Sequence, residues 1–322
     1  MEILKILKLV NAILILTLTF TSTTGNVMIL AAIWKTPSLQ TVTNVMVFSL
    51  ALSDLGIGVL SQPQGFLLFS GLVHYEGAWM ALLQVLSVSL TIISLLTITA
   101  ISVEKYLALT LHLRYCELVT TKRVICILVV IWLSSIAAAS TLRLHDILFY
   151  KMASPAVLVC LVSNIFIYQK LYRTCRLHHL RIRHQVVQLH DQHIHQTAIA
   201  DARFRKSAKT IFFILFFMII CYLPFCFYTV ALRIIMNDDV ENLPRYPMLL
   251  TVYPFTWTMV FLNSTINPAL LYFQLSEFRI AVRTLLRKLC RCRKHRISSG
   301  SMRPPDVKHQ ISLRLTFRFT KT

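Results

Sequence analysis

Seven long apolar segments are the feature of this sequence that most restricts its fold. A helix needs about 20 consecutive, mostly apolar residues to cross the hydrocarbon core of a bilayer, and even the shortest segment, the fourth, has roughly 19. The segments span residues 7–33, 42–70, 78–109, 123–141, 147–172, 208–236 and 247–274. We therefore predict an all-α membrane protein, a bundle of seven transmembrane helices.

Composition argues against the alternative that the chain is a large soluble helical protein. The 322 residues are 56% hydrophobic and 14% charged, whereas soluble domains average about 25% charged residues. A helix on the surface of a soluble protein would also show a polar stripe at 3.6-residue spacing, which these segments mostly lack. The apolar segments are therefore expected to face lipid.

Positive charge is concentrated in alternate loops. The loops after the first, third and fifth segments, with the segment ends beside them and the C-terminal tail, hold 27 of the 33 Lys and Arg residues, counting Lys105. Positively charged loops remain in the cytoplasm, so we predict a multi-pass membrane protein with its N-terminus outside and its tail in the cytoplasm. The net charge of +20 is then explained by anionic lipid on the cytoplasmic side, and no nucleic acid partner is expected.

The apolar segments imply three regions. We predict a seven-transmembrane domain over residues 1–274, an amphipathic juxtamembrane eighth helix over 275–292, and a basic, disordered cytoplasmic tail over 293–322. The first segment resembles a signal peptide, but it lacks a small-residue cleavage site and is long enough to span, so we assign it as the first helix. Apolar and basic side chains fall on opposite faces of the eighth helix, which predicts that it lies along the membrane surface.

The eight cysteines indicate neither a disulfide framework nor a metal site. None falls in a predicted extracellular loop, and no Cys/His spacing is typical of zinc. Cys290 and Cys292 follow the predicted eighth helix, where S-palmitoylation is expected.

Polar residues inside the apolar segments are the candidate functional groups, because burying them in a membrane is costly. Asp54 is the only acid deep in a segment, in "LALSDL". Other polar side chains fall at similar depth, and two of the late segments each contain a helix-breaking proline. These residues are Asn26, Ser94, Asn263, Ser264 and Asn267, with Pro224 and Pro268.

Together these motifs resemble the rhodopsin-like (class A) G-protein-coupled receptors over residues 10–290. The matching pieces are "GN" in the first segment, "LALSDL" in the second, "EKY" ending the third, a Trp in the fourth, "CYLP" in the sixth and "NPALLY" in the seventh. The resemblance implies a receptor that binds an extracellular small-molecule, lipid or peptide ligand and activates a heterotrimeric G protein. Arrestin and a receptor kinase are further implied partners.

The resemblance assigns a switch to the end of the third segment. Glu104, Lys105 and Tyr106 stand where the family has Asp/Glu-Arg-Tyr. A lysine lacks the planar fork of arginine, and the family's second acid, on the sixth helix, is replaced by Phe204. We therefore expect a weak inactive-state lock and high basal activity; a receptor that does not couple is the opposite possibility.

Further residues are assigned to G-protein coupling and switching by the same resemblance. Tyr272 stands one residue later than the family's tyrosine, and Tyr222 replaces its toggle tryptophan. The alternative is that these aromatic residues only pack the core. The assigned residues are Leu113, Tyr168, Pro224, Pro268 and Tyr272.

A sodium ion is the one allosteric ligand that the resemblance implies. Four residues match the family's sodium pocket, and a carboxylate with hydroxyl and amide oxygens suits a hard cation. The alternative is a hydrogen-bond network that only holds helices together. The four residues are Asp54, Ser94, Asn263 and Asn267. No other cofactor is expected, and retinal is excluded because Phe261 replaces the lysine that opsins need.

The extracellular ligand is expected to lie among polar and aromatic side chains in the outer half of the bundle. By analogy with the family these are Gln64, Gln84, Ser87, Thr91, Tyr222, Tyr228, Tyr253 and Trp257, and for each of them a packing role is the alternative. Ser87 replaces the aspartate of amine receptors, and Met80 replaces the cysteine of the family's outer disulfide. Members of the melanocortin, cannabinoid, lysophospholipid and adenosine groups also lack that disulfide or the helix-five proline, and the chain has a weaker likeness to them.

Other classes of protein make different predictions. Histidines between residues 178 and 195 have some likeness to the His boxes of di-iron desaturases, but they lack a companion carboxylate set. A transporter is disfavoured by the single deep acid and by the absence of an internal repeat. No catalytic triad or phosphate loop is present, so an enzyme is not expected. A decoy receptor that binds ligand without coupling stays open because of Lys105 and Tyr272.

Overall fold

The computed structural model describes residues 2–73, 77–111, 114–144, 146–188, 193–236 and 247–287. The chain divides into two compact units, Met1–Ile280 and Ala281–Thr322. The candidate functional sites described below lie in the helices of the first unit. Of the second unit only residues 281–287 are described, so Cys290, Cys292 and the predicted tail lie outside the described part of the chain.

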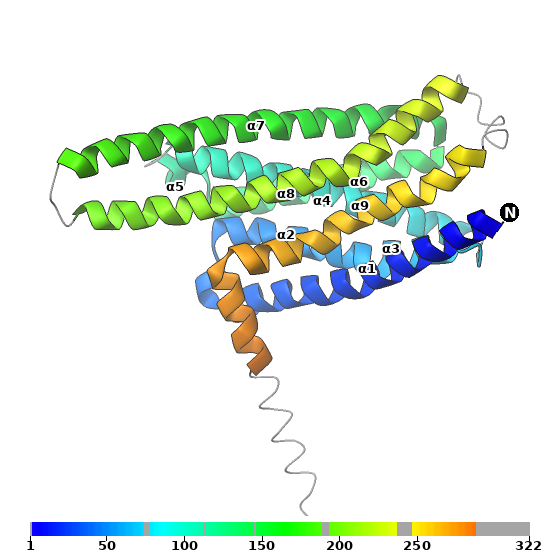
Figure 1. Cartoon of the computed structure of the whole chain (residues 1–322), viewed down its shortest axis with the longest axis horizontal. Helices are drawn as coiled ribbons and strands as arrows, with labels where there is room; N and C mark the ends of the chain where they lie inside the picture. Colours follow the sequence, from blue (N-terminus) through cyan, green and yellow to red (C-terminus); the bar gives the residue numbers. More distant parts are fainter. Residues whose placement is uncertain are drawn as a thin grey trace, which may run out of the picture. The chain divides into compact units, whose positions relative to one another are not determined.

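Every regular element among the described residues is helical (Figure 1). The long helices are α1 (Glu2–Lys35), α2 (Val42–Gly56), α3 (Gln62–Phe69), α4 (Ala78–Leu111), α6 (Thr121–Leu144), α7 (Asp146–Gln188), α8 (His193–Met236) and α9 (Pro247–Gln274). The short elements are η1 (Pro37–Leu39), η2 (Ile57–Ser61) and α5 (Tyr115–Leu118). A further helix covers residues 276–287. The predicted all-α bundle is confirmed.

Six of the described stretches are long and apolar enough to cross a membrane. They are Ile6–Lys35, Val42–Phe69, Ala78–Leu111, Thr121–Thr141, Pro155–Thr174 and Phe212–Leu232. The seventh predicted span, α9, has no charged residue but is richer in polar groups. Thr256, Asn263 and Asn267 on α9 are all buried. This helix therefore turns its polar side chains into the bundle, away from lipid.

The outward faces of the spans are apolar, as expected for contact with lipid. On α6, Val130 and Leu133 are 63% and 64% exposed. Trp34 at the end of α1 and Trp79 at the start of α4 are also strongly exposed. Tryptophan is enriched at the boundary between membrane and water, so these two residues are well placed to mark the two boundaries.

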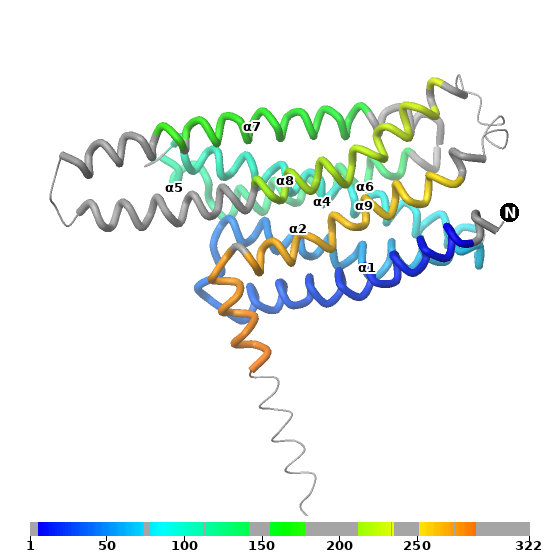
Figure 2. The backbone as a smooth tube through the Cα atoms, in the orientation of Figure 1, coloured from blue at the N-terminus to red at the C-terminus, as the bar shows by residue number. Residues whose placement is uncertain are grey.

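Helix α4 is the central element of the first unit, because it packs against α2, α6, α7 and α8. Helix α9 packs against α1 and α8, and α2 packs between α1 and α4 (Figure 2). Buried polar side chains bridge several of these pairs. The indole nitrogen of Trp132 donates to Ser49 Oγ at 3.0 Å, and Asn26 Nδ2 donates to the Ser264 carbonyl at 3.2 Å. Such bonds hold helices together where the hydrophobic effect is absent.

A π-helical turn, η2, joins α2 to α3. Pro63 lies in the first turn of α3, and a proline inside a helix removes one hydrogen bond and clashes with the carbonyl four residues earlier. The wider turn accommodates this interruption. It also rotates the residues that follow relative to Asp54, so Ser61 and Gln64 both turn inward and are buried.

Gly25 allows α1 to approach α9 closely. A Cβ atom at this position would lie 3.0 Å from Cβ and 3.1 Å from Cγ of Pro268, and a proline ring cannot move aside easily. Overpacking of this kind costs about 1–3 kcal/mol. We therefore expect Gly25→Val to lower the thermal unfolding midpoint of the purified protein by about 3–10 °C. Thr24→Val, at an exposed position on the same helix, is the control, and equal midpoints for the two variants would contradict the packing argument.

Candidate functional site

The carboxylate of Asp54 on α2 is completely buried. Ser94 on α4 donates from Oγ to Asp54 Oδ1 at 2.8 Å. Asn267 on α9 donates from Nδ2 to Asp54 Oδ2 at 2.8 Å. Three of the four residues predicted for the sodium site, from three helices, are therefore in direct contact.

The fourth predicted residue, Asn263, lies one helical turn before Asn267 and is buried. In the described part of the chain, neither its amide nitrogen nor its amide oxygen has a hydrogen-bond partner. A buried amide without a partner is costly and calls for an explanation, such as an ion or a water molecule. Nor does any described Lys, Arg or His side chain form an ion pair with Asp54, so no protein cation compensates for its charge if the group is ionised.

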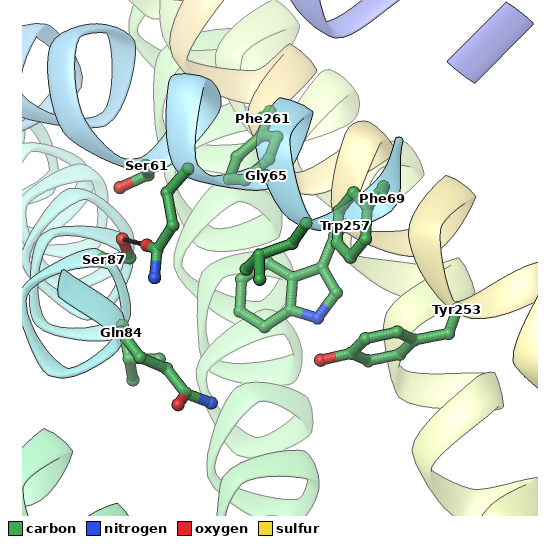
Figure 3. A pocket seen from close by; sticks show the side chains of 11 residues that line it. Ser61, Gly65, Phe69, Gln84, Ser87, Tyr253, Trp257 and Phe261 are labelled. Carbon is green, nitrogen blue, oxygen red and sulfur yellow. Dashed lines mark hydrogen bonds between the residues drawn. The ribbon is translucent and has the colours of Figure 1, made fainter. Parts of the chain in front are cut away.

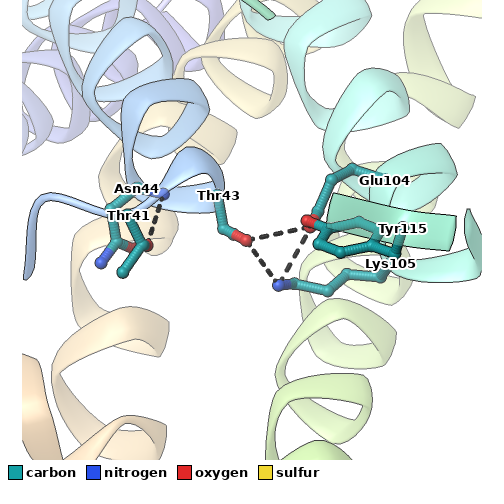
Figure 4. A network of polar contacts seen from close by, with 6 residues as sticks. All are labelled: Thr41, Thr43, Asn44, Glu104, Lys105 and Tyr115. Carbon is teal, nitrogen blue, oxygen red and sulfur yellow. Dashed lines mark hydrogen bonds and ion pairs between the residues drawn. The ribbon is translucent and has the colours of Figure 1, made fainter. Parts of the chain in front are cut away.

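A second polar cluster lies toward the C-terminal end of α4, around Glu104 and Lys105 (Figure 4). Lys105 Nζ lies 3.2 Å from Glu104 Oε2 and donates a hydrogen bond to Thr43 Oγ1 at 2.8 Å. Thr43 in turn donates to Glu104 Oε1 at 3.0 Å. The hydroxyl of Tyr115 on α5 also donates to Glu104 Oε1. Glu104 is therefore held by three side chains.

Burial, reinforced by the hydrogen bond and the negative charge of Glu104, raises the pKa of Tyr115 above its usual range. The tyrosine therefore stays protonated at neutral pH and remains a hydrogen-bond donor. Thr43 and Tyr115 were not predicted from the sequence. Lys105 therefore has a second restraint besides Glu104, because its ammonium group also donates to Thr43.

The other predicted switch residues lie in varied surroundings. The ring of Tyr168 on α7 packs against Phe212 on α8, with centroids 4.9 Å apart. Tyr272 packs edge-to-face against Phe273 at 5.3 Å. Tyr106 is partly buried. Pro224 and Pro268 lie inside α8 and α9. Leu113 is outside the described residues.

A pocket of about 460 Å³, open to solvent, lies between α3, α4 and α9 (Figure 3). Of the residues predicted to bind ligand, those that line it are Gln64, Gln84, Ser87, Tyr253 and Trp257. Ser87 and Glu104 are 17 positions apart on α4, which is about 26 Å along a helix axis. The pocket and the Glu104 cluster are therefore at opposite ends of one helix.

Three predicted ligand residues are not among the pocket lining. Tyr222 is buried and its hydroxyl donates to the carbonyl of Thr91 at 3.5 Å. Thr91 Oγ1 donates to the carbonyl of Ser87 on its own helix. Tyr228 is buried behind Tyr253, with ring centroids 5.4 Å apart. In this structure these residues support the pocket wall.

Polar atoms in the pocket are only partly paired. Ser87 Oγ donates to Gln64 Oε1 at 2.7 Å, which fixes the Gln64 amide. The hydroxyl of Ser61 and the indole nitrogen of Trp257 are buried, and neither finds a partner among the described residues. Ser61 was missed in the sequence analysis because the register of η2 determines its direction.

Comparison with known proteins places these features in a family. The sequence model of the seven-transmembrane receptors of the rhodopsin family matches residues 25–146. The adenosine receptor A2a of Canis lupus familiaris is 24% identical, over 90% of this chain and 77% of that protein. The histamine H2 receptor of Rattus norvegicus is 28% identical, over 92% of this chain and 84% of that protein.

A shorter match is closer in sequence. The adenosine receptor A3 of Ovis aries is 35% identical over 119 residues, which is 36% of this chain and 37% of that protein. These matches support a rhodopsin-like (class A) G-protein-coupled receptor. Adenosine receptors are among the groups to which a weaker likeness was stated from the sequence, and histamine receptors are not.

Similarity to this receptor family decides between the rival classes. The relatives are receptors, not enzymes, so the comparisons favour a receptor over a desaturase or a transporter. The histidines that suggested a desaturase lie where the structure does not describe the side chains. The receptor is a multi-pass protein of the plasma membrane.

Proposed function

We propose that this receptor binds an extracellular ligand in the pocket between α3, α4 and α9 and activates a heterotrimeric G protein at the Glu104 end of α4. The observation that carries the proposal is the pair of polar structures on one helix, a pocket at Ser87 and a closed ionic cluster at Glu104. The Asp54 cluster lies between them and joins α2, α4 and α9. A ligand that shifts α9 relative to α4 would therefore act on both the pocket and the Glu104 cluster.

The ligand that best fits the pocket is a small molecule. Two relatives are named for adenosine and histamine. A histamine-like amine carries a positive charge, and Ser87 offers none of the negative charge that an aspartate would supply there. An uncharged ligand fits the neutral lining better.

Sodium at Asp54 is proposed as an allosteric ion. Among the described residues no basic side chain pairs with the buried carboxylate, and the amide oxygen of Asn263, one turn before Asn267, accepts no hydrogen bond. Asp54, Ser94 and Asn263 supply the kinds of oxygen that a hard cation takes as ligands.

The N-terminus is proposed to be extracellular and the tail cytoplasmic, because the loops after the first, third and fifth spans hold most of the positive charge. We expect an antibody to stain intact cells through an N-terminal epitope tag, and to stain a C-terminal tag only after permeabilisation. The reverse pattern would overturn this topology. The same orientation exposes Cys290 and Cys292 to cytoplasmic palmitoylation, and Leu113 to the G protein.

The test of the proposed function is a screen of small molecules, lipids and peptides in cells, read out by activation of each G-protein class. The variant Lys105→Ala, matched for surface expression, is the control. A ligand response that depends on Lys105 supports coupling. Binding of a ligand at the surface with no response in any G-protein class would favour a decoy receptor. Recruitment of arrestin and of a receptor kinase would be measured in the same cells.

A further inference from the structure

We infer that the pocket between α3, α4 and α9 selects an uncharged, flat aromatic molecule that carries a hydrogen-bond acceptor for the indole nitrogen of Trp257. This inference rests on the proposed function, because it names the class of ligand for the same pocket. It adds Ser61 and the Trp257 nitrogen as the groups that determine specificity.

The first argument is the set of unpaired polar atoms. Ser61 is 1% exposed, and its hydroxyl has no hydrogen-bond partner in the described parts of the chain. The same holds for the indole nitrogen of Trp257, which can only donate. Both residues line the pocket. Leaving buried polar groups unpaired is costly, so a ligand that accepts from Trp257 gains an interaction that the empty site lacks.

The second argument is charge. Every described residue that lines the pocket is uncharged. An ammonium or carboxylate group placed there would lose its hydration without gaining an opposite charge, which costs far more than the loss of one neutral hydrogen bond. Gln84 lines the same space, and its amide supplies both a donor and an acceptor for a neutral polar group.

The third argument is the arrangement of the aromatic rings. Trp257 packs against Phe261, with centroids 6.0 Å apart, and edge-on against Tyr253 at 6.5 Å. Phe69 packs edge-on against Tyr253 at 6.0 Å, so the rings of α3 and α9 form one wall (Figure 3). Rings prefer offset-stacked or edge-to-face partners, and this wall offers both faces and edges to a flat ligand.

The fourth argument is space. A Cβ atom on Gly65 would lie 2.9 Å from Cε2 of Phe261, so only glycine lets α3 and Phe261 approach this closely. The empty space of about 460 Å³ includes open solvent at the mouth of the pocket, so the enclosed part is small. It admits a flat ring more readily than an extended peptide, which would engage only part of its own surface here.

The test uses purified full-length receptor labelled with 5-fluorotryptophan and three probes that share one ring system. They are 2-naphthamide, which is neutral, 2-naphthoate, which is an anion, and 2-naphthylmethylamine, which is a cation at neutral pH. The chain has four tryptophans, so the fluorine spectrum is simple. Trp257→Phe assigns the resonance of Trp257 by its disappearance.

We expect 2-naphthamide to shift the Trp257 resonance at a concentration at least about tenfold lower than either charged probe requires. In thermal unfolding titrations, Trp257→Phe and Ser61→Ala should each weaken 2-naphthamide binding by about 3- to 10-fold. Trp79→Phe, at an exposed position away from the pocket, should leave binding unchanged.

Binding of a charged probe as tight as that of 2-naphthamide would overturn the inference. So would a shift confined to tryptophans other than Trp257, or no shift with any probe. The measurement uses no G protein, so its failure is distinct from a failure of the receptor to couple. If the receptor binds 2-naphthamide in this way but never activates a G protein, the inference about the pocket stands and the proposed coupling is refuted.

Discussion

Replacing Glu104 with glutamine is expected to raise ligand-free G-protein activation by about 5- to 30-fold at matched surface expression. The carboxylate is the common partner of Lys105, Thr43 and Tyr115 in the closed cluster. Glutamine keeps the shape but removes the charge that holds the Lys105 ammonium group. Lys105 lacks the two parallel hydrogen bonds that an arginine would make, so its single hydrogen bond to Thr43 is the restraint that remains among the described residues.

Single hydrogen bonds should contribute less than the charge. Thr43→Val and Tyr115→Phe each remove one neutral donor to Glu104, so we expect rises of about 2- to 5-fold. Glu117→Gln is the matched control, because Glu117 is an exposed acid on α5 beside the same cluster. Lys105→Arg should increase coupling once ligand is bound, since arginine restores the planar fork.

The measurement is G-protein activation in cells for these variants and the unmutated chain. Unchanged basal activity in Glu104→Gln, with normal ligand-driven activation, would refute the locking role of Glu104. Silence of every variant in all G-protein classes, with the chain confirmed at the surface, would favour the decoy receptor.

The sequence predicted the parts of the molecule that depend on local chemistry. Apolar length alone predicted each span. Helix α7 continues beyond its apolar run as far as Gln188, and α8 begins before its apolar run, at His193. The polar residues of these extensions support a helix in water. The family resemblance grouped Asp54, Ser94 and Asn267, because each of them lies on a different helix and faces the bundle axis.

The parts that sequence reasoning missed depend on contacts between distant segments. Thr43 lies in the first turn of α2 and Tyr115 begins the short helix α5. Neither stands out in the sequence until both side chains meet at Glu104. Ser61 turns inward because of the π turn before Pro63. Tyr222 shares the inward face that suggested ligand binding, but its hydroxyl is used by Thr91, and helical periodicity cannot distinguish a pocket wall from a buried contact.

The second large effect that we expect is stabilisation of the receptor by sodium, which Asp54→Asn should abolish. We expect the thermal unfolding midpoint of the unmutated receptor to rise by about 2–4 °C when sodium chloride replaces choline chloride at equal ionic strength. Equal ionic strength removes general screening as the cause. In Asp54→Asn the amide cannot neutralise a cation, so the rise should vanish.

Asn263→Ala separates an ion site from a structural network, because the Asn263 amide has no protein hydrogen bond to lose in the described part of the chain. If Asn263 is a ligand, alanine should reduce the sodium-dependent rise and leave the midpoint in choline chloride nearly unchanged. Ser94→Ala should instead lower the midpoint in both salts, since it removes a hydrogen bond to Asp54 Oδ1. A sodium response that is absent in the unmutated receptor, or intact in Asp54→Asn, would mean that the buried carboxylate serves only to join α2, α4 and α9.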